Sequence, residues 1–112
     1  MGAGSEETDA FLLQGMLDFV RLLGRDLSLR QLTILLICVD ALELQTIGGI
    51  AQHLGIARIP TSRAVDYLAG AGLIWRKTNP EDGRSILIGP TPTGRRLCAL
   101  VVGRSHRPRS RG

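Results

Sequence analysis

Two short segments of this sequence carry arginines in settings that suit an anionic ligand. The first contains Arg58, Ser62 and Arg63, and the second is Asp-Gly-Arg at residues 82–84, which has the form of a tight turn. A guanidinium donates paired hydrogen bonds to a phosphate or to the edge of a guanine base, and a serine hydroxyl bonds to either. The formal net charge of +4 and the sequence pI of about 10.0 also favour polyanions such as nucleic acid as partners.

Catalysis and metal binding find little support in the sequence. His53 and His106 have no partner at the spacing of a catalytic or metal-binding pair, and the glycine pair 48–49 lacks the lysine and hydroxyl of a phosphate-binding loop. Cys38 and Cys98 lie far apart in apolar surroundings, without Cys-x-x-Cys spacing. We therefore expect two buried thiols, with a redox pair as the alternative, and no enzymatic activity, metal or cofactor.

Length and composition predict one folded domain with loose ends. A chain of 112 residues has room for a single core, and 4% aromatic residues are too few for a surface that stacks single-stranded bases. No apolar run reaches the roughly 18–20 residues of a membrane span, and the amino end is acidic where a signal peptide is basic. We expect a cytoplasmic protein with flexible residues 1–5, a domain over 6–103 and a disordered basic tail over 104–112. That tail could add phosphate contacts or act only as a solubility tail.

Apolar periodicity and capping signals predict two helices at the start of the domain. The first begins at Glu6 and ends at Gly24, with a wide apolar stripe that needs a partner surface. The second begins after Ser28, because Gln31 stands three residues later in the spacing of a capping box. Residues 32–39 are apolar on nearly every side, so a buried strand is the alternative, although the capping box favours a helix.

Two shorter helices and a hairpin follow. A brief extended piece at 44–46 leads to a helix over 47–54 capped by Thr46, and the next helix runs from 58 to about 71. Strands over 73–78 and 84–88 flank a turn at 79–83. Thr91 and Pro92 then open a last helix. The residues of the 58–71 helix that we expect to face the core are Thr61, Val65 and Leu68.

This order of elements predicts a mainly α fold with a small β-hairpin wing, a winged helix-turn-helix. In such folds the second helix of the pair lies in the major groove of DNA, and the hairpin is the wing. The alternative is a solvated helix with an Arg63–Asp66 surface pair. The exposed face opposite the core residues carries the candidate DNA contacts Arg58, Ile59, Ser62, Arg63 and Asp66.

The predicted wing supplies three further candidates. Arg84 lies where it could enter the minor groove, with Asp82 close enough to hold its guanidinium. An ordinary Asp-Gly turn flanked by charge is the alternative. Arg76 and Lys77 on the first wing strand are candidates for phosphate contacts, or they are edge-strand charges that deter sheet pairing.

Three segments of the chain resemble a known family. They are the stretch from Gly55 to Arg76, Asn-Pro-Glu-Asp-Gly-Arg-Ser at 79–85 and Leu-Ile-Gly-Pro-Thr-Pro-Thr-Gly at 87–94. In these segments the chain resembles the MarR family of bacterial regulators. Together with the 29–36 segment, the resemblance covers roughly residues 28–97. It implies a homodimer that reads a pseudo-palindromic site in double-stranded DNA, and it places the five residues of the major-groove face and Arg84 at the family's DNA contacts. Ala57, Pro60 and Thr61 depart from the family pattern, which affects base preference more than fold.

Members of that family carry two long carboxyl-terminal helices, and this chain has only one short helix there. We therefore expect a reduced dimer interface. Many relatives bind a small, often aromatic acid, but the four aromatic residues Phe11, Phe19, Tyr67 and Trp75 identify no such pocket, so the effector is unknown. The expected dimer residues come from the first and last helices: Phe11, Leu12, Met16, Phe19, Leu23, Leu97, Leu100 and Val101.

We thus predict a sequence-specific transcriptional regulator that binds double-stranded DNA as a homodimer, with repression as the expected mode and a nucleoid-associated location in the bacterial cytoplasm. The alternative is a winged-helix adaptor that binds another regulator or the transcription machinery in place of DNA. The basic tail and Arg84 favour DNA. The partly apolar end of the recognition helix, at Ile59 and Pro60, favours the adaptor.

Overall fold

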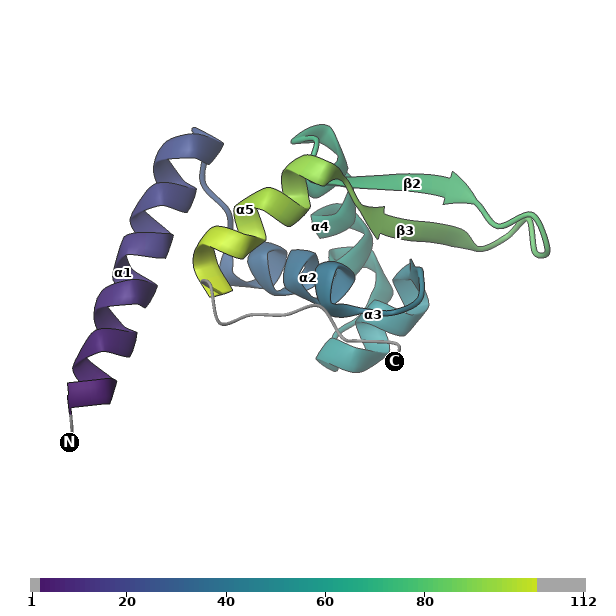
Figure 1. Ribbon diagram of the computed structural model, residues 1–112. Helices are drawn as coiled ribbons and strands as arrows, with labels where there is room; N and C mark the ends of the chain where they lie inside the picture. The colour runs from purple at the N-terminus through teal and green to yellow at the C-terminus, as the bar shows by residue number, and fades with distance from the viewer. Residues whose placement is uncertain (1–2, 103–112) are drawn as a thin grey trace.

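The computed structural model describes residues 3–102, and those residues form five helices and a three-stranded sheet (Figure 1). The first helix begins at Ala3, earlier than the predicted Glu6. Alanine, serine and glutamate near this end all tolerate a helix. The predicted tail at 104–112 lies outside the described residues. In chain order the elements are α1 (Ala3–Leu23), α2 (Leu29–Asp40), β1 (Gln45–Thr46), α3 (Ile47–Leu54), α4 (Arg58–Gly70), β2 (Ile74–Thr78), β3 (Ile86–Pro90) and α5 (Pro92–Val102).

Capping chemistry sets the helix boundaries as the sequence indicated. The backbone N–H of Gln31 donates to Ser28 Oγ at 3.0 Å, and the N–H of Ser28 donates to Gln31 Oε1 at 2.8 Å, so the capping box of α2 is complete. Residues 32–39 are therefore helical, and the alternative strand is wrong. Thr46 Oγ1 accepts from the N–H of Gly49 at 3.0 Å and begins α3. Gly55 ends α3 with a φ of 70° that favours glycine.

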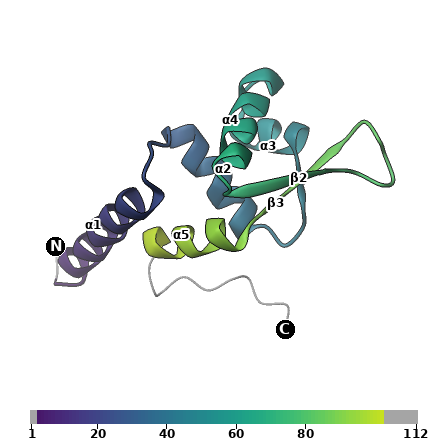
Figure 2. The same ribbon diagram turned by 90° about the horizontal axis from the view of Figure 1, so that it is seen from above.

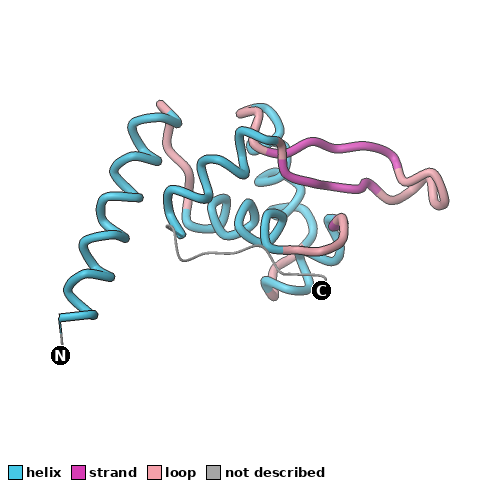
Figure 3. Tube along the Cα trace, viewed as in Figure 1, coloured by secondary structure: helices cyan, strands magenta, loops and turns pink. Residues whose placement is uncertain are grey.

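The sheet is antiparallel with the order β1-β3-β2, and β2 and β3 form a projecting hairpin (Figure 3). Trp75 pairs with Gly89 in register. A Cβ on Gly89 would overlap the indole ring of Trp75, so glycine is needed where the ring covers the strand. The prediction that β3 begins at Arg84 is wrong, because β3 begins at Ile86. The loop is longer than predicted because Asp82 accepts hydrogen bonds within residues 82–85.

The core lies where α2, α4 and the sheet meet. Ile34 and Leu35 of α2, Leu68 of α4 and Ile88 of β3 are fully buried. Thr61 is also fully buried, and its hydroxyl donates to the carbonyl of Ala57 at 2.9 Å. That bond satisfies the one polar side chain that is buried in the described core. Because α4 buries the face that carries Thr61 and Leu68 in this core, its opposite face is exposed to solvent.

Both cysteines are buried on helices α2 and α5. Burial raises the pKa of the Cys38 thiol from 9.0 to about 12. Burial also raises the pKa of Cys98 to about 12, with a smaller contribution from the neighbouring Cys38. A thiol with so high a pKa is almost entirely protonated near neutral pH and is a poor nucleophile. This supports the prediction of structural thiols over that of a redox pair.

Helices α1 and α5 pack together on the opposite side of the domain from the hairpin (Figure 2). Gly15 permits this close approach, since an added Cβ would overlap the carbonyl oxygen of Leu100. Phe19 and Leu97, which we expected at a dimer surface, are 3% and 7% exposed. That expectation is corrected for these two residues, because both side chains are buried in the core of the single chain. No helix within residues 3–102 has both the length and the hydropathy needed to cross a membrane.

Candidate nucleic-acid interface

The exposed face of α4 carries the side chains that the sequence analysis assigned to it. Arg58, Ile59, Arg63 and Asp66 are exposed, and Ser62 is half-buried. The residues that alternate with them, among them Thr61 and the core aliphatic side chains, are buried. Ala57 at the N-cap makes no side-chain hydrogen bond, so the first N–H groups of α4 have no capping side chain. The first turns of α4 therefore carry two exposed arginines, Arg58 and Arg63, and backbone N–H groups without a capping side chain.

An ion pair joins α4 to the hairpin. Arg76 Nη1 of β2 donates to Asp66 Oδ1 of α4. The alternative of an Arg63–Asp66 surface pair is therefore not what the structure shows, because Asp66 has turned to β2. Both side chains are about half exposed, so the pair adds little to stability. The pair instead links β2, the first strand of the wing, to α4.

The loop of the hairpin is shaped by two side chains that bond to nearby backbone. Asn79 Oδ1 accepts from the N–H of Glu81 at 2.9 Å, and Asp82 Oδ1 accepts from the N–H of Arg84 at 3.0 Å. The other carboxylate oxygen of Asp82 accepts from Ser85 Oγ at 3.0 Å. The expectation that Asp82 holds the Arg84 guanidinium is thus wrong. Asp82 fixes the backbone at Arg84 and leaves the guanidinium to a ligand.

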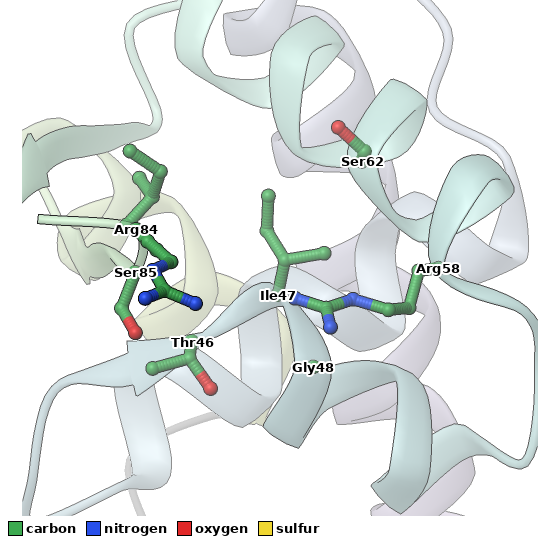
Figure 4. A pocket seen from close by; sticks show the side chains of 8 residues that line it. Thr46, Ile47, Gly48, Arg58, Ser62, Arg84 and Ser85 are labelled. Atoms are coloured by element: carbon green, nitrogen blue, oxygen red, sulfur yellow. The ribbon is translucent and has the colours of Figure 1, made fainter. Parts of the chain in front are cut away.

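A cleft of about 420 Å³ opens between the start of α3, the start of α4 and the wing loop (Figure 4). Arg58 and Arg84 enter it from opposite sides, and their guanidinium groups point toward each other across Ile47. The Arg58 guanidinium lies against the first turn of α3, with Cζ 3.5 Å from the position of a Cβ on Gly48. No aspartate or glutamate of the described part of the chain lines this cleft. Its lining residues are Thr46, Ile47, Gly48, Arg58, Ser62, Arg84, Ser85 and Ile86.

Sequence reasoning missed the part of this cleft that α3 supplies. Thr46 was identified only as a helix cap, and Gly48 was weighed only as part of a phosphate-binding loop. Their closeness to Arg84 depends on the pairing of β1 with β3, in which Thr46 lies opposite Leu87. A two-residue strand has too weak a signal in sequence to predict that pairing.

Lys77 lies on the exposed side of β2, where its ammonium group is 5.6 Å from the centre of the Trp75 ring. A cation over an aromatic ring is attracted to the π face, which holds this long side chain along the strand. Lys77 is therefore exposed on β2, the outer strand of the hairpin. The structure does not bring it into the cleft.

A second cavity, of about 530 Å³, lies between α2 and α5 and was not predicted. Aliphatic side chains such as Leu36 and Val102 make up most of its wall, with Asp40 and Arg95 among the lining residues and Cys98 beside them. None of the four aromatic residues lines it. The sequence therefore carries no aromatic pattern that would predict this cavity.

Comparison with known proteins places this geometry among regulators. The model of the MarR family matches residues 25–85. No curated protein sequence gives a significant match. The chain is similar in fold to MepR of S. aureus in a DNA complex, with a TM-score of 0.69, 23% identity, and coverage of 88% of this chain and 75% of that chain.

Two structures of the regulator CouR are also similar. The repressor CouR bound to a 23-mer DNA duplex gives a TM-score of 0.63 and 30% identity, over 93% of this chain and 74% of that chain. CouR from Rhodococcus jostii RHA1 bound to p-coumaroyl-CoA gives a TM-score of 0.60 and 27% identity, over 87% of this chain and 69% of that chain. In each comparison the relative is longer than this chain.

Proposed function

This chain belongs to the MarR family of DNA-binding transcriptional regulators, and from that premise we propose that it acts as a homodimer that reads a specific double-stranded site and represses transcription. One observation carries the proposal. Arg58 of α4 and Arg84 of the wing line one cleft, Arg63 is exposed on α4, and the core residues of α4 are buried. That is the arrangement a winged helix presents to a duplex.

On this proposal the exposed face of α4 enters the major groove. Arg63 and Ser62 are the candidates for hydrogen bonds to base edges, and Ile59, which is 67% exposed, suits contact with a thymine methyl. The ion pair with Arg76 gives Asp66 a role in positioning the wing. The hairpin then reaches the neighbouring minor groove, and Arg76, Lys77 and Arg84 are the candidates for contacts with the DNA there.

Helix α1 supplies the surface that we propose for the dimer. Its amino-terminal half stands clear of the other described elements (Figure 1), and Phe11 and Leu12 there are 71% and 51% exposed. Leu13, Leu17 and Val20 form an exposed stripe on a second face, at helical spacings of four and three. A run of exposed apolar side chains this large marks an interaction site in a protein that stays in solution. A second copy of α1 matches it, because a twofold interface is self-complementary.

The cavity between α2 and α5 is our candidate for a small-molecule effector site. Its size falls within the range of ligand pockets, and its aliphatic wall, with Arg95 and Asp40 as the charged residues, suits a molecule that has an apolar body and a polar group. The structure of CouR with p-coumaroyl-CoA shows that one similar regulator binds an organic ligand. The cavity also lies between α5, which contacts the proposed dimer helix α1, and α2, which contacts the proposed DNA-reading helix α4. An occupant would therefore touch helices that contact both α1 and α4.

Binding of the full chain to a random-sequence duplex at increasing salt tests the proposal. Each neutralised phosphate contributes about 0.9 to the slope of log K against log salt. We expect a steep negative slope, and we expect Arg63→Ala to weaken binding while Arg21→Ala, an equal charge change at the end of α1, leaves it nearly unchanged. Selection of bound sites from a random DNA pool should then return two half-sites about one helical turn apart. Wild-type chain that shows no salt-dependent binding would reject the proposal.

The adaptor remains a second candidate because of Ile59, whose large exposed side chain begins the recognition helix next to Pro60. Such a residue suits an apolar pocket on another protein as well as a thymine methyl. The two functions separate in the same assay. If duplex binding is absent and Ile59→Ala abolishes capture of a protein partner while Arg63→Ala does not, the adaptor is correct.

A further inference from the structure

We propose that the cleft between α3, α4 and the wing loop is a phosphate site that holds a single backbone phosphate of the DNA between Arg58 and Arg84. This inference rests on the proposed function and refines it. The sequence analysis gave Arg84 a contact inside the minor groove. The structure instead directs its guanidinium back toward the start of α3, where Arg58 meets it (Figure 4).

The charge of the cleft is the first argument. Two guanidinium groups from separate segments share one cavity, and none of its lining residues is acidic. Like charges held this way repel each other, and an anion between them relieves that repulsion. The side-chain carboxylate nearest in sequence to Arg84 is Asp82, and it is already engaged with the Arg84 N–H and the Ser85 hydroxyl. Among the described residues no carboxylate lines the cleft, so the anion that we propose is one from another molecule.

The shape of the cleft is the second argument. Gly48 has no side chain, so the Arg58 guanidinium lies against the first turn of α3. Ser62 of α4 and Ser85 of the wing loop also line the cleft, on opposite sides of it (Figure 4). Guanidinium and hydroxyl donors around one small space suit the oxygens of a phosphate. Both arginines are exposed, so a continuous sugar-phosphate strand can reach the space between them.

Position is the third argument. The cleft lies at the junction of the recognition helix and the wing, which on the proposed function contact the major groove and the minor groove. The strand that separates those grooves must pass this junction. A phosphate held from both sides would fix the register of the protein along the duplex without reading sequence.

A matched pair of substitutions at Gly48 tests the site without removing an arginine. Gly48→Glu adds a carboxylate beside the Arg58 guanidinium, and Gly48→Gln adds a neutral side chain of the same size. Both should fold, because either residue is a better helix former than glycine. In a titration with a random-sequence duplex, we expect Gly48→Glu to weaken binding about tenfold or more relative to Gly48→Gln, as for the loss of one charge-assisted contact. Equal affinities for the two variants would overturn the proposal.

A double-mutant cycle distinguishes one shared phosphate from two separate ones. If Arg58 and Arg84 bind the same phosphate, the double variant Arg58→Ala/Arg84→Ala lowers the salt slope by about 0.9, and the single effects are not additive. With a slope change of that size, the ratio of wild-type affinity to double-variant affinity falls about 3.5-fold as the salt concentration rises from 50 to 200 mM. A slope change of about 1.8 with additive effects would mean that each arginine has its own phosphate, and the shared site would be wrong.

Inorganic phosphate serves as the free-anion probe, followed by the backbone amide signals of the full chain. Perturbation of Thr46, Gly48 and Ser85 by inorganic phosphate, together with weaker duplex binding of the double variant, supports a site for a DNA phosphate. The same perturbation with unchanged duplex binding means a site for free anions, which overturns the inference while the proposed function stands. If wild-type chain fails to bind duplex at any salt, the proposed function itself has failed.

Discussion

The contact between Gly15 and the backbone of Leu100 makes a quantitative prediction about how α1 is attached. A Cβ added at Gly15 would overlap the Leu100 carbonyl oxygen, lie 2.9 Å from its carbon and lie 3.4 Å from Val101 Cα. These are backbone atoms that cannot rotate aside, so Gly15→Ala must push α1 away from α5. Overpacking of this kind costs about 1–3 kcal/mol. Alanine recovers about 1 kcal/mol through its helix propensity, so we expect a net loss of about 0–2 kcal/mol relative to wild type, and of about 1–3 kcal/mol relative to a glycine-to-alanine substitution that gains the same propensity without overlap.

Gly70→Ala is the matched control, because a Cβ at this helical glycine of α4 meets nothing within 4 Å. We expect it to be neutral or stabilising by up to about 1 kcal/mol. Thermal unfolding at one fixed protein concentration is the assay, since dimerisation makes the melting temperature depend on concentration. Gly15→Ala should melt roughly 5–20 °C below Gly70→Ala. If Gly15→Ala is as stable as Gly70→Ala, α1 does not pack on α5 as described.

Three further predictions concern the ion pair, the dimer and the thiols. Asp66→Asn removes the partner of Arg76, so duplex affinity should fall while the free energy of unfolding in urea changes by less than about 1 kcal/mol. If the affinity losses of Asp66→Asn and Arg76→Ala are fully additive in the double variant, Asp66 does not act through Arg76. Leu13→Glu/Val20→Glu should leave a monomer of 12.1 kDa by light scattering, whereas Leu29→Glu, at a residue exposed at the start of α2, should not; a doubly substituted chain that stays dimeric would refute the α1 interface. Since the pKa of both thiols is about 12 in the folded chain and 9.0 when exposed, the unfolded chain loses these protons first as pH rises. Unfolding free energy should therefore fall between about pH 9 and pH 12, by about 1.4 kcal/mol per thiol at pH 10; a Cys38→Ala/Cys98→Ala chain with the same pH slope would show that the thiols are not the cause.

Local signals in the sequence were enough to predict most of the fold. Ser28 with Gln31, Thr46 and Gly55 mark helix ends through hydrogen bonds and backbone angles that act within four residues. The inward face of α4 follows from spacing alone, because the helix period separates Thr61 from Ser62. These features depend on neighbouring residues, so sequence reasoning reaches them.

What the sequence could not predict depends on contacts between distant segments. Phe19 has the same apolar character whether it faces a second subunit or α5, and only the close approach at Gly15 decides for α5. Asp66 could pair with Arg63 one turn away or with Arg76 on the wing, and the path of the hairpin decides. The direction of the Arg84 side chain likewise follows from the loop that Asp82 shapes.

The account rests on the claim that the exposed face of α4 and the wing loop together form the DNA-binding surface. Amide hydrogen exchange of the full chain, measured with and without a random-sequence duplex at low salt, tests it most directly. Protection by the duplex should concentrate in residues 58–66 and 76–86, with the cavity between α2 and α5 unaffected. Protection confined to other segments, or exchange that is unchanged in residues 58–66 when the duplex is bound, would contradict the account.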